Sequence, residues 1–165
     1  MTDFDRRRLV RYAAIVVLLL ALGGAGYAYL SYTAEHSRGP DGLPDHRAVR
    51  ASDLWPRPVA KLYYPGSTVV ETARSDQSDD PNNPASGPAR AETLLDSSAK
   101  SGDLLPWYVR ELESQGFKTT SYPALDVLGG PGELDAEWRR GRREYFDLRV
   151  YVGKSQYRVV YLVTR

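Results

Sequence analysis

Apolar residues follow one another without interruption along residues 12–32 and recur with shorter periods farther along the chain. The run YAAIVVLLLALGGAGYAYLSY contains no charged residue. At the rise of an α-helix it is about 31 Å long, which matches the hydrocarbon layer of a bilayer. The pattern therefore predicts a single transmembrane helix over residues 12–32.

Beyond residue 58, apolar and polar residues alternate, which is the period of a β-strand with one buried face. The pattern predicts early strands over 67–73, 91–99 and 117–122. A type II turn at Pro65 and Gly66 precedes the first of them. Three consecutive antiparallel strands follow, and their inward-facing residues are Leu134, Ala136 and Trp138, then Phe146, Leu148, Val150 and Val152, and finally Val159, Tyr161 and Val163.

One segment between these strands has a helical period instead. Asp103 is the expected N-cap, which places Pro106 in the first turn, where its missing N–H costs nothing. Gly116 suits the left-handed residue after the helix, and Phe117 can fold back to close a Schellman motif. The predicted apolar face recurs at three-four spacing and consists of Leu105, Tyr108, Val109 and Leu112.

These elements predict an α+β fold in which one amphipathic helix packs on an antiparallel sheet, preceded by the single transmembrane helix. We expect this domain over residues 59–165, with a polar, disordered loop at 74–90. Residues 33–58 are rich in proline and glycine and are expected to form a linker, with one short helical turn near residues 46–54.

The overall charge excludes little, whereas the absence of cysteine excludes several chemistries. Lys and Arg number 22 against 21 Asp and Glu, so no global field favours a polyanion or a polycation. With no cysteine, the chain has no disulfide, no catalytic thiolate and no cysteine-based zinc site. Both histidines, His36 and His46, lie in the expected linker and are interpreted as solvated rather than as metal ligands.

The distribution of arginine around the apolar run predicts its orientation. Four arginines precede the run and only Arg38 follows it closely, so the positive-inside rule places residues 1–11 in the cytoplasm and the domain outside. Tyrosines near both ends suit the membrane interface. The arginines that precede the run are Arg6, Arg7, Arg8 and Arg11.

A cleaved signal peptide is the main alternative to an anchor. Gly23-Gly24-Ala25 and Gly26-Tyr27-Ala28 both offer the small residues that a cleavage site needs. The apolar run is longer than an ordinary signal peptide core, which favours an uncleaved anchor over a secreted product. A buried core helix is the least favoured interpretation.

The polar loop contains a partial calcium-binding pattern. Its oxygen-bearing residues recur at every second position, as in calcium loops, but Pro81 stands where a turning glycine is needed and Gly87 where a closing glutamate is needed. We therefore interpret the segment as a solvated surface loop. The residues of the pattern are Asp76, Ser78, Asp80 and Asn82.

An arginine cluster, EWRRGRREY over residues 137–145, is expected at the tip of a β-hairpin with Gly141 in its turn. The cluster is a candidate patch for anionic lipid, an acidic envelope polymer or a carboxylate-rich protein. The alternative, favoured by the arginine-rich composition, is solvated turn residues that form cross-strand ion pairs with Glu137 and Glu144. Nucleic acid is not expected outside the cell. The four candidate residues are Arg139, Arg140, Arg142 and Arg143.

Several short motifs together resemble parts of uncharacterised bacterial single-pass membrane proteins that carry a small extracytoplasmic α+β domain. These motifs are Tyr64-Pro65-Gly66, the polar loop, and the segment from Trp107-Tyr108 through Leu112 to Gly116-Phe117. The resemblance covers about half the chain and implies a similar fold and location. It carries no active residues.

The sequence therefore predicts a membrane-anchored extracytoplasmic binding or assembly module of the bacterial cell envelope. Its expected partners are membrane lipid, through residues 12–32, and an envelope protein or anionic polymer. No nucleophile with a base, carboxylate pair or metal cluster is evident in the sequence, so no enzyme activity, cofactor, metal or small-molecule substrate is expected. An envelope-acting enzyme, or a secreted domain after signal-peptide cleavage, is the alternative.

Overall fold

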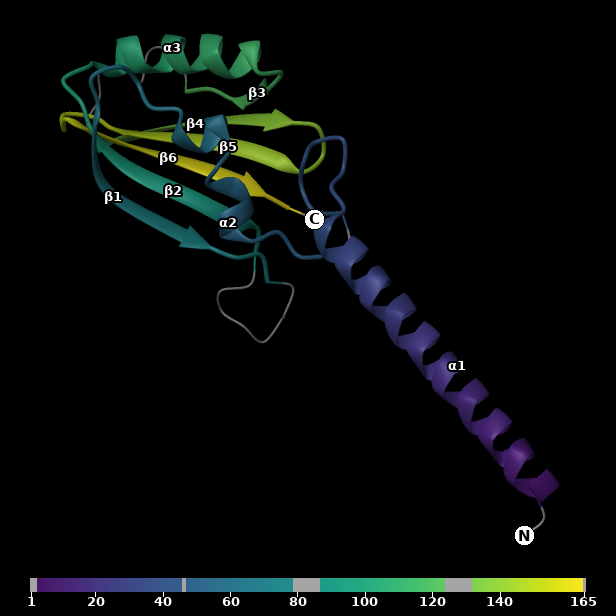
Figure 1. Ribbon diagram of the computed structural model, residues 1–165. Helices are drawn as coiled ribbons and strands as arrows, with labels where there is room; N and C mark the ends of the chain where they lie inside the picture. Colours follow the sequence, from purple (N-terminus) through teal and green to yellow (C-terminus); the bar gives the residue numbers. More distant parts are fainter. Residues whose placement is uncertain (1–2, 46, 79–86, 124–131, 165) are drawn as a thin grey trace. The chain divides into compact units, whose positions relative to one another are not determined.

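A computed structural model describes residues 3–45, 47–78, 87–123 and 132–164. The chain forms two compact units, Met1–Arg47 and Ala48–Arg165. The first unit contains the long helix α1 (Asp3–His36), and the second contains the whole β-sheet (Figure 1). His46, one of the two histidines of the expected linker, lies outside the described residues.

Helix α1 extends beyond the predicted bounds of 12–32 at both ends. No glycine or proline interrupts the residues that flank the apolar run, so the helix continues through them and ends at His36, shortly before Gly39-Pro40. His36 belongs to this last turn, where its ring stacks on Tyr32 at a centroid distance of 4.1 Å and its Nδ1 lies 2.8 Å from the Tyr32 carbonyl oxygen. His36 is thus a helical residue and not part of a flexible linker.

Within α1, the stretch Val16–Thr33 is long and apolar enough to cross a membrane. Its large apolar side chains are all exposed, from 54% at Val16 to 76% at Tyr27. It is the one candidate span that the described residues contain. Such a helix is compatible with a membrane anchor or with a signal sequence, and the orientation of the chain stays a prediction.

The chain after α1 folds into a tight turn. The Gly39 amide donates to the Leu43 carbonyl at 2.8 Å, and Gly42 adopts a positive φ of 74°. The Asp41 carboxylate accepts from the Leu43 amide at 2.9 Å. A β-bridge between Arg38 and Pro44 flanks the turn.

The second unit begins at Ala48, earlier than the boundary expected at residue 59. Helix α2 (Ala51–Leu54) and the 3-10 helix η1 (Pro58–Lys61) both contribute buried side chains. The Val49 amide donates to the Gln77 side chain at 3.1 Å, and the Ala51 amide donates to the Asp76 carboxylate at 2.7 Å. Residues from Ala48 onward, which were expected to form part of the linker, therefore belong to the domain. Polar side chains that follow β1 accept hydrogen bonds from their backbone amides.

Six antiparallel strands form one sheet in the order β1-β2-β6-β5-β4-β3. The α+β class, the type II turn glycine Gly66 (φ 79°) and the final three-strand meander are confirmed. The strands β1 and β3 form the two edges. The strand bounds are β1 (Thr68–Ser75), β2 (Ala89–Asp96), β3 (Lys118–Ser121), β4 (Glu133–Arg140), β5 (Glu144–Tyr151) and β6 (Gln156–Val163).

Strands β1 and β2 shorten the loop that was expected over 74–90. β1 continues to Ser75, β2 begins at Ala89, and Ser78 and Gly87 pair in an isolated β-bridge between them. Asp80 and Asn82 of the partial calcium pattern lie outside the described residues, as do residues 79–86 as a whole.

One face of the sheet carries the domain's core. Trp138, Phe146, Leu148, Tyr157 and Tyr161 are all buried, in keeping with the predicted alternation. The predicted inward-facing residues of the meander are buried as well, except Val152, which is half-buried at the strand end. The opposite face is polar along β4, where Glu133, Asp135, Glu137 and Arg139 are exposed.

Helix α3 (Ser101–Ser114) begins earlier than predicted. Its N-cap is Lys100, so Asp103 lies within the first turn and Pro106 inside the helix. The missing proline N–H would have bonded to the carbonyl four residues back, on Gly102, and Gly102 is exposed to water. An exposed carbonyl can be solvated without a helical partner, which allows the helix to start before Asp103.

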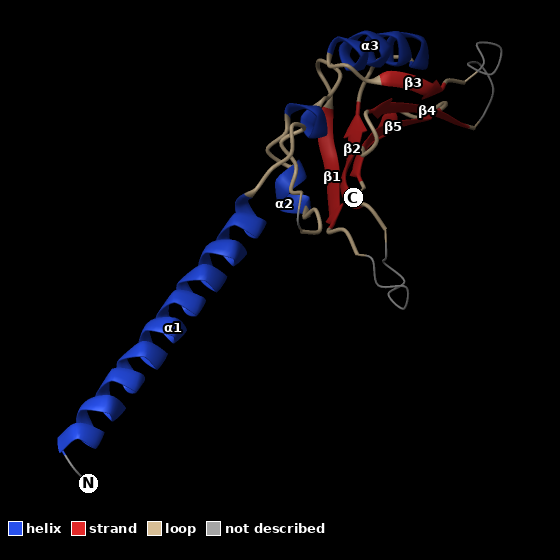
Figure 2. Ribbon diagram, turned by 90° about the vertical axis from the view of Figure 1, so that its right-hand side faces the viewer, coloured by secondary structure: helices blue, strands red, loops and turns tan. Residues whose placement is uncertain are grey.

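The carboxyl end of α3 is the predicted Schellman motif. Gly116 adopts a positive φ of 83°, the Phe117 amide donates to the Leu112 carbonyl at 3.0 Å, and the Gly116 amide donates to the Glu113 carbonyl at 2.9 Å. Phe117 is buried. The motif satisfies the last carbonyls of α3 and turns the chain into β3 (Figure 2).

Tyr108 links α3 to the sheet. Its ring centroid lies 5.7 Å from that of Phe146 in β5 and 6.1 Å from that of Tyr157 in β6, and its hydroxyl donates to the Leu62 carbonyl at 2.8 Å. Leu104 is buried on α3, whereas the predicted core residue Val109 is half-buried. Helix α2 contacts β2 and η1 contacts β6, so α3 is not the only helix against the sheet.

Candidate functional site

The four candidate arginines lie at the β4–β5 hairpin, where Gly141 adopts a positive φ of 62° as predicted. The four side chains differ in exposure. Arg139 and Arg142 are exposed, whereas Arg140 and Arg143 are half-buried. Arg139 donates to the Gly141 carbonyl at 2.9 Å, and its guanidinium lies 5.3 Å from the Tyr145 ring centroid.

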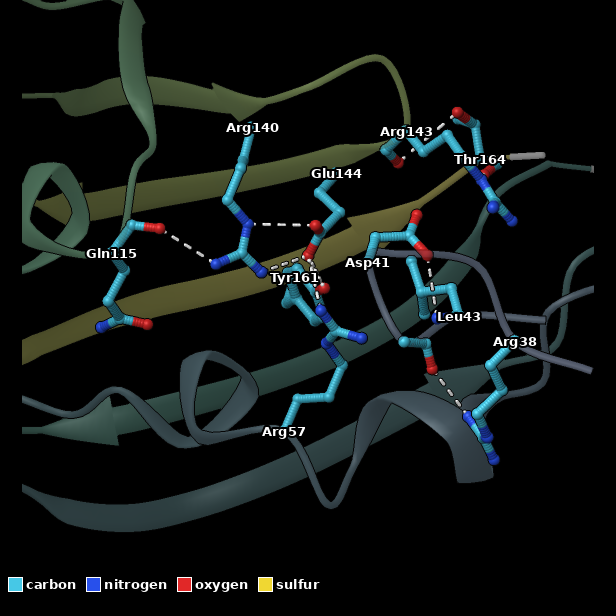
Figure 3. A network of polar contacts seen from close by, with 11 residues as sticks. Arg38, Asp41, Leu43, Arg57, Gln115, Arg140, Arg143, Glu144, Tyr161 and Thr164 are labelled. Carbon is cyan, nitrogen blue, oxygen red and sulfur yellow. Dashed lines mark hydrogen bonds and ion pairs between the residues drawn. The ribbon is translucent and has the colours of Figure 1, made fainter. Parts of the chain in front are cut away.

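Arg140 points into the domain. Its Nε donates to Glu144 Oε1 at 3.0 Å and its Nη2 to Glu144 Oε2 at 2.6 Å, a bidentate pair shown in Figure 3. Its Nη1 donates to the Gln115 carbonyl at 3.0 Å, and its guanidinium lies 4.6 Å from the Phe117 ring centroid. The expected ion pair with Glu144 is confirmed, and the donors that bind Glu144 and Gln115 are not available to a ligand.

Glu144 is the centre of this network and is only 3% exposed. Arg57 contacts its Oε2 at 3.1 Å, and the Tyr161 hydroxyl donates a short hydrogen bond to the same oxygen. Burial disfavours the charge of Arg140, but the hydrogen bonds and the charge of Glu144 outweigh it and raise the pKa of the guanidinium. Burial, followed by the Glu144 contact, also raises the pKa of Tyr161.

The network connects segments that are far apart in the sequence. It joins the residue before η1, the β4–β5 hairpin, β6 and the end of α3, through Arg57, Glu144, Tyr161 and Gln115 respectively. A carboxylate with three donors and little exposure is a satisfied ion, which makes it a structural element and a poor general base. The sequence offered no signal for the contribution of Arg57 or Tyr161.

Arg143 fixes the end of the chain. Its Nε donates to the Thr164 carbonyl at 3.1 Å, and the Thr164 amide donates back to the Arg143 carbonyl at 2.8 Å. These two bonds extend the pairing of β5 with β6 by one step. Arg139 and Arg142 are therefore the two arginines that the hairpin tip presents to solvent.

We predict opposite outcomes for the neighbours Arg140 and Arg139. Arg140→Ala removes one of two arginines that neutralise buried Glu144 and should lower the free energy of unfolding by about 2 to 3 kcal/mol. Arg139→Ala removes an exposed side chain and should change it by less than about 0.5 kcal/mol. Urea unfolding of the full chain in a mild detergent measures both, and equal losses would contradict the assignment of Arg140 to the interior.

A pair of carboxylates lies on the open face of the sheet, opposite the core. Asp147 of β5 is directly opposite Glu137 of β4 in the strand register. Burial raises the pKa of Asp147 to about 6, the Glu137 charge adds to this, and the charges of Arg90 and Arg149 partly offset it. Glu137 is exposed, so the pair is not the enclosed set of two carboxylates that an acid–base enzyme would use.

The raised pKa of Asp147 predicts a pH dependence of stability. The pKa of Asp147 is near 4 in the unfolded chain and about 6 in the folded chain. Between these two pH values the folded state binds more protons than the unfolded state, so the free energy of unfolding decreases as pH rises. Allowing for solvent screening at this half-exposed site, we expect Asp147→Asn to stabilise the chain by about 1 kcal/mol at pH 7 and by much less at pH 4. Urea unfolding at both pH values tests this, and a pH-independent difference would refute it.

A cavity of about 400 Å³ lies between the start of α3 and the β5–β6 turn. Its rim is closed where the Ser97 amide donates to the Ser155 carbonyl at 2.6 Å. Lys100 and Lys154 are its charged lining residues, and Lys154 Nζ lies 5.8 Å from the Tyr151 ring centroid. The sequence pattern assigned these segments only to a strand, a helix start and a turn, and did not indicate that they meet.

A second, more open hollow of about 530 Å³ lies between α3 and the edge strand β3. Pro106, Val109 and Tyr122 supply its apolar side chains, and Arg110 and Glu113 its charged ones. This hollow accounts for the half-buried state of Val109, which faces the hollow instead of the core.

No metal site or family assignment helps to choose between these features. Among the described residues, no group of three or more His, Cys, Asp or Glu is placed to hold a metal ion. No protein-family model, curated protein or solved structure matches the chain.

Proposed function

We propose that the protein is a membrane-anchored extracytoplasmic binding or assembly module of the bacterial cell envelope. The observation that carries this proposal is the apolar stretch Val16–Thr33, whose large side chains are exposed in a helix joined to a separate compact domain. A helix that is apolar all round is stable only in a nonpolar environment. A bilayer supplies that environment and leaves the domain outside it.

Two features support the proposed orientation and the anchor. Arg6, Arg7, Arg8 and Arg11 precede the span, and the positive-inside rule retains such residues in the cytoplasm. The helix is continuous through the small residues at 23–28, which include both candidate cleavage sites. We therefore favour an uncleaved anchor over a secreted product.

The domain's best-placed carboxylates support binding over catalysis. Glu144 is fully engaged by Arg57, Arg140 and Tyr161, and Asp147 lies on the open face of the sheet beside exposed Glu137. By contrast, the domain has a cavity and a surface hollow with charged side chains at both. Hollows of this size are typical of ligand sites.

We also propose that α3 is the main helical cover of the sheet, as the amphipathic pattern indicates. The buried stripe Leu104, Leu105, Tyr108 and Leu112 supports this, together with the ring contacts from Tyr108 to Phe146 and Tyr157. The short helices α2 and η1 contact the sheet at β2 and β6. The amino end of α3 lines the cavity through Ser101 and Leu104.

The anchor predicts that the full-length protein, 18.4 kDa, stays in the membrane fraction after carbonate washing. Leu19→Arg combined with Leu20→Arg should release it or prevent insertion, because each arginine at a helix centre costs about 3 kcal/mol. Immunoblotting of the fractions measures both. A product found only in soluble fractions and shortened by about 25 residues would show a cleaved signal peptide.

The arginine cluster contributes a second proposal of narrower scope. Arg139 and Arg142 are exposed at the hairpin tip, beside the ring of Tyr145, and can meet an anionic surface or an acidic envelope partner. Arg140 and Arg143 support the tip through their internal bonds. We thus assign the patch to Arg139 and Arg142, and a supporting role to the other two.

Vesicle sedimentation tests this assignment with full-length protein in neutral-lipid nanodiscs. Arg139→Ser with Arg142→Ser should weaken binding to phosphatidylglycerol vesicles by about 30-fold, since each arginine near an anionic surface adds about 1 kcal/mol. The control variant, Arg110→Ser with Lys118→Ser, removes the same amount of positive charge from α3 and β3 and should have little effect on vesicle binding. Equal losses in the two variants would show that only net charge matters.

A further inference from the structure

We propose that the cavity beside the amino end of α3 binds a small hydroxylated organic anion through Lys100 and Lys154. This inference assigns a ligand class to the proposed binding module and in that sense depends on it. The cavity is formed by residues 97–101, Leu104 and residues 150–157, which bring together the end of β2, the start of α3 and the β5–β6 turn. Three separate segments thus meet at one hollow.

The charged residues that line the cavity are all positive. Lys100 and Lys154 are the charged residues there, and neither aspartate nor glutamate lines the cavity. The chain has only four lysines, at positions 61, 100, 118 and 154, while its other cations are arginines. Two of the four lysines therefore lie at a single cavity, where a flexible ammonium can adjust to an oxyanion that enters.

Hydroxyl-bearing residues line the cavity together with the two lysines. The lining includes Ser97, Ser98, Ser101 and Ser155, each of which can donate to an oxygen atom of a ligand. Ser97 is buried, and its Oγ accepts from the Ala99 amide at 3.2 Å, which holds the loop leading to Lys100. The polar groups are therefore carried by a loop with fixed geometry and not by a free chain end.

The start of α3 adds to the positive potential. Its N-cap is Lys100, which makes no capping hydrogen bond with its side chain. The first backbone amides of a helix carry a partial positive charge that favours anions. This contribution is secondary to the two lysines and has the same sign.

The size and floor of the cavity indicate an organic ligand instead of a bare inorganic ion. At about 400 Å³ the cavity is within the range of small-molecule sites and has room for roughly a dozen waters, far more than one phosphate displaces. Leu104, Val150 and Tyr157 supply an apolar floor. The arrangement suits a phosphate or carboxylate attached to a small polyol or sugar.

Calorimetry of the full chain in a neutral detergent tests the proposal with three probes. Glycerol 3-phosphate carries a phosphate with hydroxyls, glucuronate a carboxylate with hydroxyls, and glucose is the neutral control. We expect at least one of the two anions to bind, with glucose silent and binding weakened by added salt. Which anion binds more tightly identifies the head group.

Two lysine variants and a matched control locate the site. Lys100→Ser and Lys154→Ser should each weaken binding at least tenfold, whereas Lys118→Ser removes the same charge from exposed β3 and should leave it unchanged. Thermal unfolding of each variant shows whether the fold is retained. Equal weakening by Lys118→Ser would overturn the site, as would the absence of heat with both anions at 10 mM (a concentration about tenfold above a millimolar Kd).

Lysine acetylation of the unmodified protein provides a test that needs no variant. The bound anion should protect Lys100 and Lys154 from limiting acetylation and leave Lys61 and Lys118 as internal references, with peptide mass spectrometry as the readout. Protection in phosphatidylglycerol nanodiscs without added ligand would identify a lipid head group as the source. Uniform reactivity at all four lysines would refute the proposal.

The result is separable from the test of the anchor. Membrane fractionation reports on Val16–Thr33 alone, whereas calorimetry and acetylation report on Lys100 and Lys154. A retained anchor with no anion binding would overturn only the ligand class. Anion binding by a protein recovered in the soluble fraction would overturn only the anchor.

Discussion

The cost of exposing an apolar helix to water is the constraint on which the account of this protein depends. Between Val16 and Leu30, valine and leucine side chains are all more than half exposed, and fully burying each one is worth about 1.5 to 3 kcal/mol. Summed over the span, this is as large as the roughly 5 to 15 kcal/mol that stabilises a whole domain. This cost is the basis of the proposed membrane anchor, which would keep the domain within reach of the membrane.

Inside the domain, burial of charge has a comparable organising effect. Glu144 is removed from water and is compatible with the core only because Arg57, Arg140 and Tyr161 donate to it. Because Arg140 is directed inward to Glu144, the exposed arginines of the hairpin tip are Arg139 and Arg142. We propose the cavity, whose charged lining residues are Lys100 and Lys154, as the clearer anion site of the domain.

The sequence predicted those features that depend on local periodicity. The apolar run, the alternating residues of β4, β5 and β6, and the Schellman motif at Gly116 each involve neighbours in the chain. What it missed depends on contacts between distant segments. Gln77 and Asp76 bind the backbone near Val49 and Ala51, which draws expected linker into the domain, and the cavity exists only because Ser97 and Ser155 meet.

The topology of the chain is the most direct test of this account. Alkaline phosphatase, active only outside the cytoplasm, and green fluorescent protein, fluorescent only inside it, can be fused in turn to the C-terminal residue Arg165. We expect phosphatase activity in membranes and no fluorescence. A fluorescent, phosphatase-inactive fusion would place the domain in the cytoplasm and contradict the proposal of an extracytoplasmic module.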